Sequence, residues 1–465
     1  MVFTSIFFLF FFIVIYLLYI HSATKNKIII LVASSFLFYA AWSFVFALHF
    51  LLILLINYFF IYLFFTKQKP YYFPLILAIN ILNLLVFKYL YLLLSLITDS
   101  SPAFLFDETG GHTITLPLAI SFYTFQLVAF QVDLKKGLIK TRPSLAEFFL
   151  FVMFFPQLVA GPIMRHSDFF HQIKNINPDE NQTLTGSYYV LQGVVKKILI
   201  ADNLAPLIDP VFQNPAIYKS SSLILSAFAY IFRLYCDFSG YTDIARGLGR
   251  LMGIDLPENF RGPYLSQSLT ELWRRWHITL SSWLRDYVYY PLGGSKTSVL
   301  YNFRNLFITF LLGGIWHGAN WTFLLWGAFH GMVLVLEKTA GLFRKSLPVS
   351  FPPVLQKILP LTGIVYTLTV FSFSMIFFNS STIQTALAMT GNLTGSAQGM
   401  VLPSQDFVVF AGFATLIFNY IQYHELQEKL YLKSGWTGLF FLSILAFVLL
   451  SRFAAGGSEF IYFQF

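Results

Sequence analysis

Long uninterrupted apolar runs constrain this chain more than any other feature of its sequence. A helix needs about 20 consecutive apolar residues to cross the hydrocarbon core of a bilayer. Only 11% of the 465 residues are charged and 57% are hydrophobic, whereas a typical soluble protein carries roughly 25% charged residues. Too few charges remain to cover a soluble globule of this size, so we expect lipid to be the solvent. The apolar runs are Val2–Ile20, Ile28–Ala47, Leu48–Phe65, Tyr71–Ile97, Ile114–Leu134, Leu145–Ala160, Leu184–Ile208, Leu223–Tyr235, Leu300–Trp316, Trp321–Leu336, Val354–Phe378, Phe407–Tyr423 and Trp436–Leu450.

The expected fold class is all-α, a polytopic integral membrane protein with about ten to twelve transmembrane helices. A closed β-barrel would show short alternating segments instead of long continuous runs. Re-entrant and interfacial helices are also expected, because Leu145–Ala160 is short and Leu184–Ile208 carries Lys196, Lys197 and Asp202. The expected parts of one membrane-embedded domain, residues 1–465, are N-terminal helices over 1–142, a catalytic core over 143–340 and C-terminal helices over 341–465.

The charges predict the orientation of the helices. Thirty Lys and Arg residues stand against 21 Asp and Glu residues, a net charge of +9. Short loops rich in Lys and Arg stay in the cytoplasm, so the excess indicates such loops and no nucleic-acid partner. Basic residues bound alternate turns, which places the amino terminus and the uncharged linker from Asn379 to Gln405 outside. The orientation rests on Lys25, Lys27, Lys67, Lys69, Lys135, Lys136, Lys140, Arg142, Arg344, Lys345 and Lys357 inside, and on Asp99, Asp107 and Glu108 outside.

Polar residues gather between Asp237 and Trp321, and ionisable groups at membrane depth tend to mark function. Ser268 and Glu271 have the spacing of a capping box at a helix start. We expect an amphipathic helix from about Leu269 to Val288, lying on the cytoplasmic rim. His277 borders its apolar stripe, where it either points into the protein or is an interfacial histidine among aromatic residues. The polar face carries Arg274, Arg275, Ser281, Ser282 and Arg285.

A second cluster surrounds His317 in the sequence Gly-Gly-Ile-Trp-His-Gly-Ala-Asn-Trp. Gly314 with Gly318, and Gly327 with Gly331, have the spacing that lets membrane helices approach closely. The flanking glycines are also expected to open space for a ligand near the ring. Desolvation would keep such an imidazole neutral and therefore basic. The alternative is a core histidine bonded to a carbonyl group.

A third group, Arg233, Asp237, Asp243 and Arg246, suggests structural ion pairs. Arg233 precedes Asp237 by four residues and Asp243 precedes Arg246 by three, so on a helix each acid could neutralise its neighbouring base.

Other site motifs are weak. The glycines between Gly247 and Gly253 do not have the spacing of a dinucleotide fingerprint, and one cysteine, Cys236, excludes an intramolecular disulfide and a multi-cysteine metal cluster. His166 and His171 have a possible but weakly supported metal spacing, and no metal is expected. Chemistry without an energy-coupling motif suggests transfer from an activated donor.

At the two histidine clusters the sequence resembles the membrane-bound O-acyltransferase family, specifically its bacterial branch that acetylates polysaccharides such as alginate. The resemblance runs along nearly the whole chain, including the ending Phe-Ile-Tyr-Phe-Gln-Phe. Its motifs are Phe-Phe-Pro-Gln-Leu-Val-Ala-Gly-Pro-Ile from Phe154, Tyr-Cys-Asp-Phe-Ser-Gly-Tyr-Thr-Asp-Ile-Ala from Tyr235, Pro-Glu-Asn-Phe from Pro257, Leu-Trp-Arg-Arg-Trp-His-Ile-Thr-Leu-Ser from Leu272, Trp-Leu-Arg-Asp-Tyr from Trp283, Pro-Leu-Gly-Gly from Pro291 and Gly-Gly-Ile-Trp-His-Gly from Gly313.

The resemblance implies a multi-pass enzyme of the bacterial inner membrane, with helices around a central tunnel that donor and acceptor enter from opposite faces. His317 matches the family's presumed catalytic histidine and His277 its second polar position. On this basis His317 takes the proton of an acceptor hydroxyl, while His277 orients the donor or donates to the developing oxyanion. The other expected tunnel residues are Trp316, Asn320, Trp276, Asp237, Ser239 and Tyr241.

The implied donor is an acyl thioester, acetyl-coenzyme A or a carrier protein, with no permanently bound cofactor. Arg274, Arg275 and Arg285 would hold its phosphates or the acidic carrier, or else anchor the helix to anionic lipid. In this branch the acyl group usually passes to a separate periplasmic or extracellular acyltransferase. The alternatives are D-alanyl transfer to teichoic acid from a carrier protein, a transporter, and a scaffold for polysaccharide export.

Overall fold

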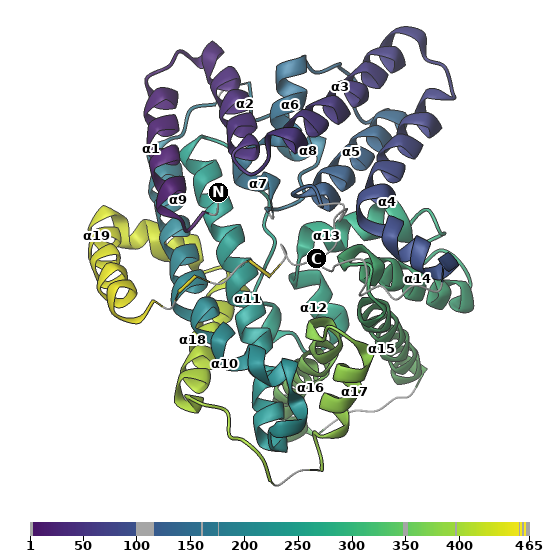
Figure 1. The fold of residues 1–465 in the computed structure, drawn as a ribbon, viewed down its shortest axis with the longest axis vertical. Helices are drawn as coiled ribbons and strands as arrows, with labels where there is room; N and C mark the ends of the chain where they lie inside the picture. The colour runs from purple at the N-terminus through teal and green to yellow at the C-terminus, as the bar shows by residue number, and fades with distance from the viewer. Residues whose placement is uncertain are drawn as a thin grey trace. The chain divides into compact units, whose positions relative to one another are not determined.

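The computed structural model of this chain is almost entirely helical over the residues that it describes, which are 3–98, 116–159, 161–174, 176–346, 352–395, 398–454, 456–457 and 460–461 (Figure 1). Within these ranges β-structure is limited to two isolated bridges, Tyr218 to Met400 and Phe260 to Trp276. Eight of the described helices are long and apolar enough to cross a membrane, and Ile6–Ile20 is apolar but shorter. The all-α membrane class is therefore confirmed, although this count is below the ten to twelve crossings expected.

Contacts divide the chain into two compact units. Unit 1 comprises Met1–Val190 and Tyr241–Pro257. Buried amide side chains connect two of its apolar helices. Asn57 and Asn80 exchange side-chain hydrogen bonds of 2.9 Å, each donating to the other. Such bonds satisfy polar groups that lipid cannot solvate. The helices of this unit are α1 (Ile6–Ile20), α2 (Thr24–Ala40), α3 (Phe44–Lys67), α4 (Tyr72–Thr98), α5 (Ile120–Lys135), α6 (Leu145–Met153), α7 (Phe155–Leu158) and α8 (His166–Phe169).

Unit 2 comprises Leu191–Gly240 and Glu258–Phe465, and it contains every candidate site residue except Tyr241. Two helices, α9 (Glu180–Val194) and α11 (Ser220–Leu251), contribute to both units. The remaining elements are the π-helix η2 (Val195–Ala201), α10 (Asp202–Gln213), the 3₁₀ turns η3 (Pro215–Ile217) and η4 (Pro263–Leu265), α12 (Leu269–Arg275), α13 (Ile278–Leu284), the π-helix η5 (Arg285–Tyr289), α14 (Val299–His317), α15 (Trp321–Ser346), α16 (Pro353–Asn379), α17 (Ile383–Gly391), α18 (Gln405–Tyr423) and α19 (Gln427–Phe453).

The helices α14 and α15 pack against each other with their backbones in close contact. A Cβ atom on Gly314 would lie 2.4 Å from the carbonyl oxygen of Phe323 and 2.9 Å from Cα of Gly327. One on Gly327 would lie 2.6 Å from the carbonyl oxygen of Phe310. The predicted close approach is therefore confirmed at Gly314 and Gly327, since any larger residue would force the helices apart.

The buried charges of unit 2 pair differently from the prediction. Nζ of Lys197 lies 2.6 Å from Oδ1 of Asp237 and 2.8 Å from Oδ1 of Asp202. Arg233 pairs with Asp209 instead of Asp237, so the pair predicted from helical spacing is wrong. The side chain of Asp237 meets the π-helix η2, and this tertiary contact replaces the neighbour four residues away.

Three expectations about the fold stay predictions: the orientation of the loops, the division of the chain into parts and one ion pair. The side of the membrane that each loop faces and the division at 142 and 340 stay predictions, and Asp99, Asp107 and Glu108 lie outside the described residues. Arg246 places its guanidinium 4.6 Å from the ring centre of Tyr189, and its predicted pairing with Asp243 also stays a prediction.

Candidate functional site

The helix predicted from Leu269 to Val288 is interrupted at Trp276 and His277. Trp276 is extended (φ −107°, ψ 129°), and His277 has the left-handed conformation (φ 43°, ψ 53°), which is uncommon outside glycine. The N–H of Arg261 donates to the carbonyl of Arg275 at 3.0 Å, and the N–H of Ile278 donates to the carbonyl of Asn259 at 3.0 Å. The prediction of one continuous helix is therefore wrong, because an extended segment pairs with the chain where α12 ends and α13 begins.

Only one of the two hydrogen bonds of the predicted capping box is present at the start of α12. Oγ of Ser268 accepts the backbone N–H of Glu271 at 3.1 Å, but the Glu271 carboxylate accepts from the N–H of Gln267 instead of Ser268. The carboxylate of Glu337 also accepts the backbone N–H groups of Leu269 and Thr270, at 2.7 and 2.9 Å. A negative charge at a helix start is favourable, so this residue of α15 fixes α12 from outside it.

The tautomer of His277 follows from its hydrogen bonds. Oδ1 of Asn259 accepts the backbone N–H of Thr279 at 3.2 Å, a bond that only an oxygen can make, and its hydroxyl at 2.9 Å. Nδ1 of His277 lies 3.1 Å from the same oxygen and must therefore donate a proton to it. His277 lies outside the helices that are long and apolar enough to cross a membrane. Its side chain is buried, with 1% of the residue exposed, and this burial lowers its pKa to about 3.

A neutral imidazole with its proton on Nδ1 has a lone pair on Nε2. His277 is therefore a hydrogen-bond acceptor at Nε2. The expectation that it donates to an oxyanion conflicts with this tautomer. Orientation of a donor that carries its own N–H or O–H group is compatible with it.

His317 ends α14 inside a wall of aromatic rings and is 5% exposed. Its ring centre lies 4.9 Å from those of Trp316 and Phe378 and 5.1 Å from that of Trp326. A Cβ on Gly318 would lie 2.5 Å from the Phe323 ring. The expectation that Gly318 leaves room for a ligand is therefore wrong, since Phe323 fills that space.

Trp316 connects the two candidate catalytic histidines. Its ring centre lies 6.1 Å from that of His277 and 4.9 Å from that of His317. The structure thus brings His277, Trp316 and His317 together, although 40 residues separate the histidines in sequence. Trp276, at the break before α13, packs edge-on against Phe260, with ring centres 5.0 Å apart.

His330 is a buried polar residue of this region that the sequence argument missed. Its Nδ1 accepts the indole N–H of Trp273 at 3.3 Å, and its Nε2 lies 3.0 Å from Oγ of Ser374. It is fully buried, and its ring centre lies 4.7 Å from that of Trp326. A histidine inside an apolar run, between Gly327 and Gly331, was the available signal.

The remaining expected tunnel residues have other neighbours. The Asn320 side chain donates to the carbonyl of Ser381 at 2.9 Å. Asp237 accepts from the backbone N–H of Ile461 at 2.8 Å besides its ion pair with Lys197.

Two further candidates are also buried. Ser239 accepts from Nζ of Lys196 at 2.8 Å, and Tyr241, in unit 1, stacks on Phe3 with ring centres 4.5 Å apart. A role for these residues or for Asn320 and Asp237 in a tunnel stays a prediction.

The two histidines of the weak metal motif point to different partners. Nδ1 of His166 lies 3.1 Å from Oδ2 of Asp133, and Nδ1 of His171 lies 2.8 Å from the carbonyl oxygen of Ser167. The partner of His166 thus belongs to α5, whereas that of His171 lies four residues before it in α8.

The three candidate donor-binding arginines differ in availability. Arg275 forms an ion pair with Glu271 at 3.0 Å and lies 4.0 Å from the ring centre of Tyr423. Arg285 forms a two-pronged pair with Asp286, at 2.7 and 3.2 Å, which raises its pKa. Arg274 is exposed and has no ion pair within the described part of the chain, so it is the most available for an anionic ligand.

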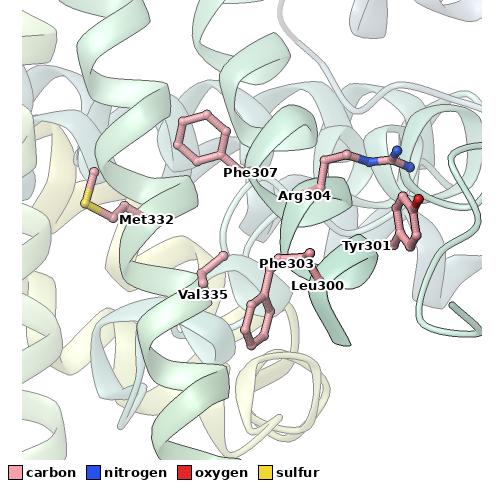
Figure 2. A pocket seen from close by; sticks show the side chains of 7 residues that line it. All are labelled: Leu300, Tyr301, Phe303, Arg304, Phe307, Met332 and Val335. Carbon is pink, nitrogen blue, oxygen red and sulfur yellow. The ribbon is translucent and has the colours of Figure 1, made fainter. Parts of the chain in front are cut away.

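A cavity of about 540 Å³ lies between α14 and α15, and neither His277 nor His317 is among its lining residues; Figure 2 shows this lining. Its lining holds one ionisable cation, Arg304, which lies over Tyr301, and no histidine or carboxylate. The lining residues are Leu300, Tyr301, Phe303, Arg304, Phe307, Met332 and Val335.

Comparisons with known proteins match this chain to one family model and to several relatives. Residues 72–382 match the family described as MBOAT, membrane-bound O-acyltransferase. The probable alginate O-acetylase AlgI of Pseudomonas aeruginosa is 41% identical over 350 residues, which cover 73% of this chain and 66% of that protein. The peptidoglycan O-acetyltransferase of Helicobacter pylori is 36% identical, over 61% of this chain and 57% of its own length. The teichoic acid D-alanyltransferase of Bacillus subtilis is 32% identical, over 48% and 59%.

Proposed function

Because the chain belongs to the membrane-bound O-acyltransferase family, we propose that it moves an acetyl group from a cytoplasmic thioester to a hydroxyl, for O-acetylation of a polysaccharide outside the cytoplasmic membrane. The observation that carries this proposal is the position of His317. Its buried imidazole lies at the end of α14, and the ring of Trp316 contacts both this imidazole and that of His277. Greater identity over a larger share of the chain with the alginate and peptidoglycan enzymes supports acetyl over D-alanyl transfer.

His317 acts as the general base in this reaction. A thioester is already activated, so the chemistry needs a stronger nucleophile. His317 takes the hydroxyl proton as the oxygen attacks the carbonyl carbon, the C–S bond then breaks, and the proton passes to the departing thiolate. General-base help of this kind typically contributes about 10²–10⁴-fold in rate.

His277 holds the donor in place. Its Nε2 lone pair accepts a hydrogen bond from an N–H group, such as the amides of a pantetheine arm, or from the incoming hydroxyl. Its left-handed backbone and its bond to Asn259 hold the ring in one orientation, which suits a positioning role because a fixed geometry lowers the entropic part of the barrier.

The donor approaches from the cytoplasm and the acceptor from the opposite face, through a tunnel between the helices. Arg274 provides the phosphate or carrier contact, since it is exposed and outside any ion pair among the described residues. The acceptor hydroxyl belongs to a separate extracytoplasmic acyltransferase, which passes the acetyl group to the polymer. In this arrangement the amino terminus faces outward in the bacterial inner membrane.

The test is turnover of radiolabelled acetyl-coenzyme A by the purified protein in detergent or proteoliposomes. We expect release of free thiol and an acetylated hydroxyl product, accelerated by a co-purified extracytoplasmic partner. His317→Ala should reduce transfer by at least about 10²-fold without changing expression or the melting temperature.

The matched control is His171→Ala, at an exposed histidine outside the site, which should keep normal activity. A protein that moves acyl groups or polymer but leaves every thioester intact would be a transporter. Near-normal transfer by His317→Ala would remove this histidine from the mechanism.

A further inference from the structure

Thioester transfer needs a hydrogen-bond donor at the carbonyl oxygen, because negative charge develops there as the hydroxyl attacks. His317 is occupied with the proton of the nucleophile, and His277 accepts hydrogen bonds at Nε2 in the tautomer that Asn259 imposes. Neither histidine therefore supplies the donor, and another group near His317 must do so.

The indole N–H of Trp326 meets this description. Trp326 is 3% exposed, and its ring lies 5.1 Å from that of His317 with the two planes at 88°. Its Nε1 has no hydrogen-bond partner among the described residues. A buried donor without a partner destabilises the folded state, and such groups in native proteins call for an explanation, a catalytic role among them.

Neighbouring side chains hold the ring of Trp326 without satisfying its N–H. Its ring centre lies 4.7 Å from His330, 5.7 Å from Trp273 and 5.4 Å from Phe378. Both nitrogens of His330 are already used, one by the indole of Trp273 and the other by Ser374. The adjacent indole of Trp273 is thus paired, whereas the indole N–H of Trp326 has no partner within the described ranges.

One turn earlier on α15, Thr322 adds to this pattern. Residues four apart lie on the same helix face, and Thr322 is completely buried with its hydroxyl lacking a partner in the described part of the chain. Its helix is pressed against the end of α14 through Gly314 and Gly327. Trp326, which contacts His317, and Thr322 one turn before it thus present two donors that have no partner among the residues the structure describes.

We propose that the indole N–H of Trp326 donates to the carbonyl oxygen of the acyl thioester and stabilises the oxyanion of the tetrahedral intermediate. The acceptor oxygen bonds to the carbonyl carbon, and the electron pair of the C=O π bond moves to the oxygen that faces Trp326. When the intermediate collapses, that pair re-forms C=O, the C–S bond breaks, and the thiolate receives the proton held by His317. This assignment rests on the proposed acyl transfer.

The first test compares Trp326→Phe with Trp321→Phe, using acetyl-coenzyme A as the donor. Both variants remove an indole from α15, but Trp321 is 48% exposed and outside the site. We expect Trp326→Phe to lower kcat by about 10²–10³-fold with KM for the donor nearly unchanged, and Trp321→Phe to match the wild type. Trp326→Tyr, which regains a hydroxyl donor, should recover part of the loss.

A second test does not depend on turnover. In a His317→Ala background, the isotope-edited infrared band of ¹³C-labelled acetyl-coenzyme A should move to lower frequency on binding, since a hydrogen bond weakens C=O. Adding Trp326→Phe should return the band toward its free position. An unchanged kcat in Trp326→Phe, a raised KM alone, or an unaltered band would overturn the assignment. Absence of thioester turnover in the wild type would instead reject the proposed function, and this inference with it.

Discussion

Asn259 accepts a hydrogen bond at Oδ1 from Nδ1 of His277, over 3.1 Å, and the same oxygen receives the N–H and hydroxyl of Thr279. One amide oxygen thus ties an extended segment to the break between α12 and α13. It also decides which nitrogen of His277 carries the proton. The bond therefore links the local backbone to the chemistry available at Nε2.

Replacing Asn259 should damage both the fold and the reaction. Asn259→Ala leaves three buried donors without their acceptor, each costing roughly 1–3 kcal/mol if water does not replace it, and frees the ring of His277. We expect a lower melting temperature and at least about a tenfold loss of kcat. Asn259→Asp keeps an acceptor and adds a charge that raises the pKa of His277, so it should retain more stability and shift the pH profile of kcat/KM upward. Asn214→Ala, at an exposed asparagine, is the control. Equal effects of all three substitutions would contradict the role of this oxygen.

His277 should make the protein sensitive to acid. Burial lowers its pKa to about 3, below the unfolded value of about 6.5. Between these values the unfolded chain binds a proton that the folded chain does not, so the free energy of unfolding falls as pH falls, by up to about 1.4 kcal/mol per unit. Thermal melts from pH 7 to pH 4 should show a shallower decline for His277→Asn than for the wild type. The same slope in both proteins would exclude this contribution.

The contact between α14 and α15 should tolerate no side chain at its closest point. Gly314→Ala places a methyl group 2.4 Å from the carbonyl oxygen of Phe323, and backbone atoms cannot move aside without shifting both helices. We expect a fall in melting temperature together with a loss of activity, because His317 ends the same helix. Gly341→Ala adds the same methyl group to α15 where nothing lies within 4 Å, and alanine there should be neutral or stabilising. Wild-type activity and stability in Gly314→Ala would show that the helices pack less closely.

Lys197 should be essential to unit 2 through its two carboxylate partners. Lys197→Met leaves Asp202 and Asp237 buried and without their cation, a change that typically costs about 3–5 kcal/mol. Poor expression or a strongly reduced melting temperature is expected, with partial recovery when Asp202→Asn is added. Lys174→Met, at an exposed lysine, should have little effect. Wild-type stability in Lys197→Met would mean that the carboxylates need no cation.

Substitutions of the adjacent residues Arg274 and Arg275 should have different effects, the first on donor binding and the second on stability. Arg274→Ala removes an exposed cation and should raise KM for acetyl-coenzyme A severalfold at low salt, with kcat unchanged. Arg275→Ala removes an ion pair with Glu271 and the contact with Tyr423, so it should lower the melting temperature instead. The measurements are donor kinetics at two ionic strengths and thermal unfolding of both variants. A salt-independent KM that both variants share would indicate that Arg274 does not meet the donor.

The sequence by itself determined the class of the molecule, because the length of an apolar run and the scarcity of charges are properties that do not depend on packing. It also located His317, His277 and the glycines of α14 and α15, since these lie within motifs and spacings that can be read along one segment. The close approach at Gly314 and Gly327 followed from the absence of side chains there.

Only the tertiary structure decided which residues form hydrogen bonds and ion pairs with one another across helices. The helix expected from Leu269 to Val288 breaks at His277 because the preceding loop, at Asn259 and Arg261, forms backbone hydrogen bonds with Ile278 and Arg275 that a continuous helix would have to forgo. Lys197, not Arg233, neutralises Asp237, and His330 satisfies the indole of Trp273 but not that of Trp326. Such choices depend on which side chains meet across helices, and helical spacing describes only neighbours within one helix.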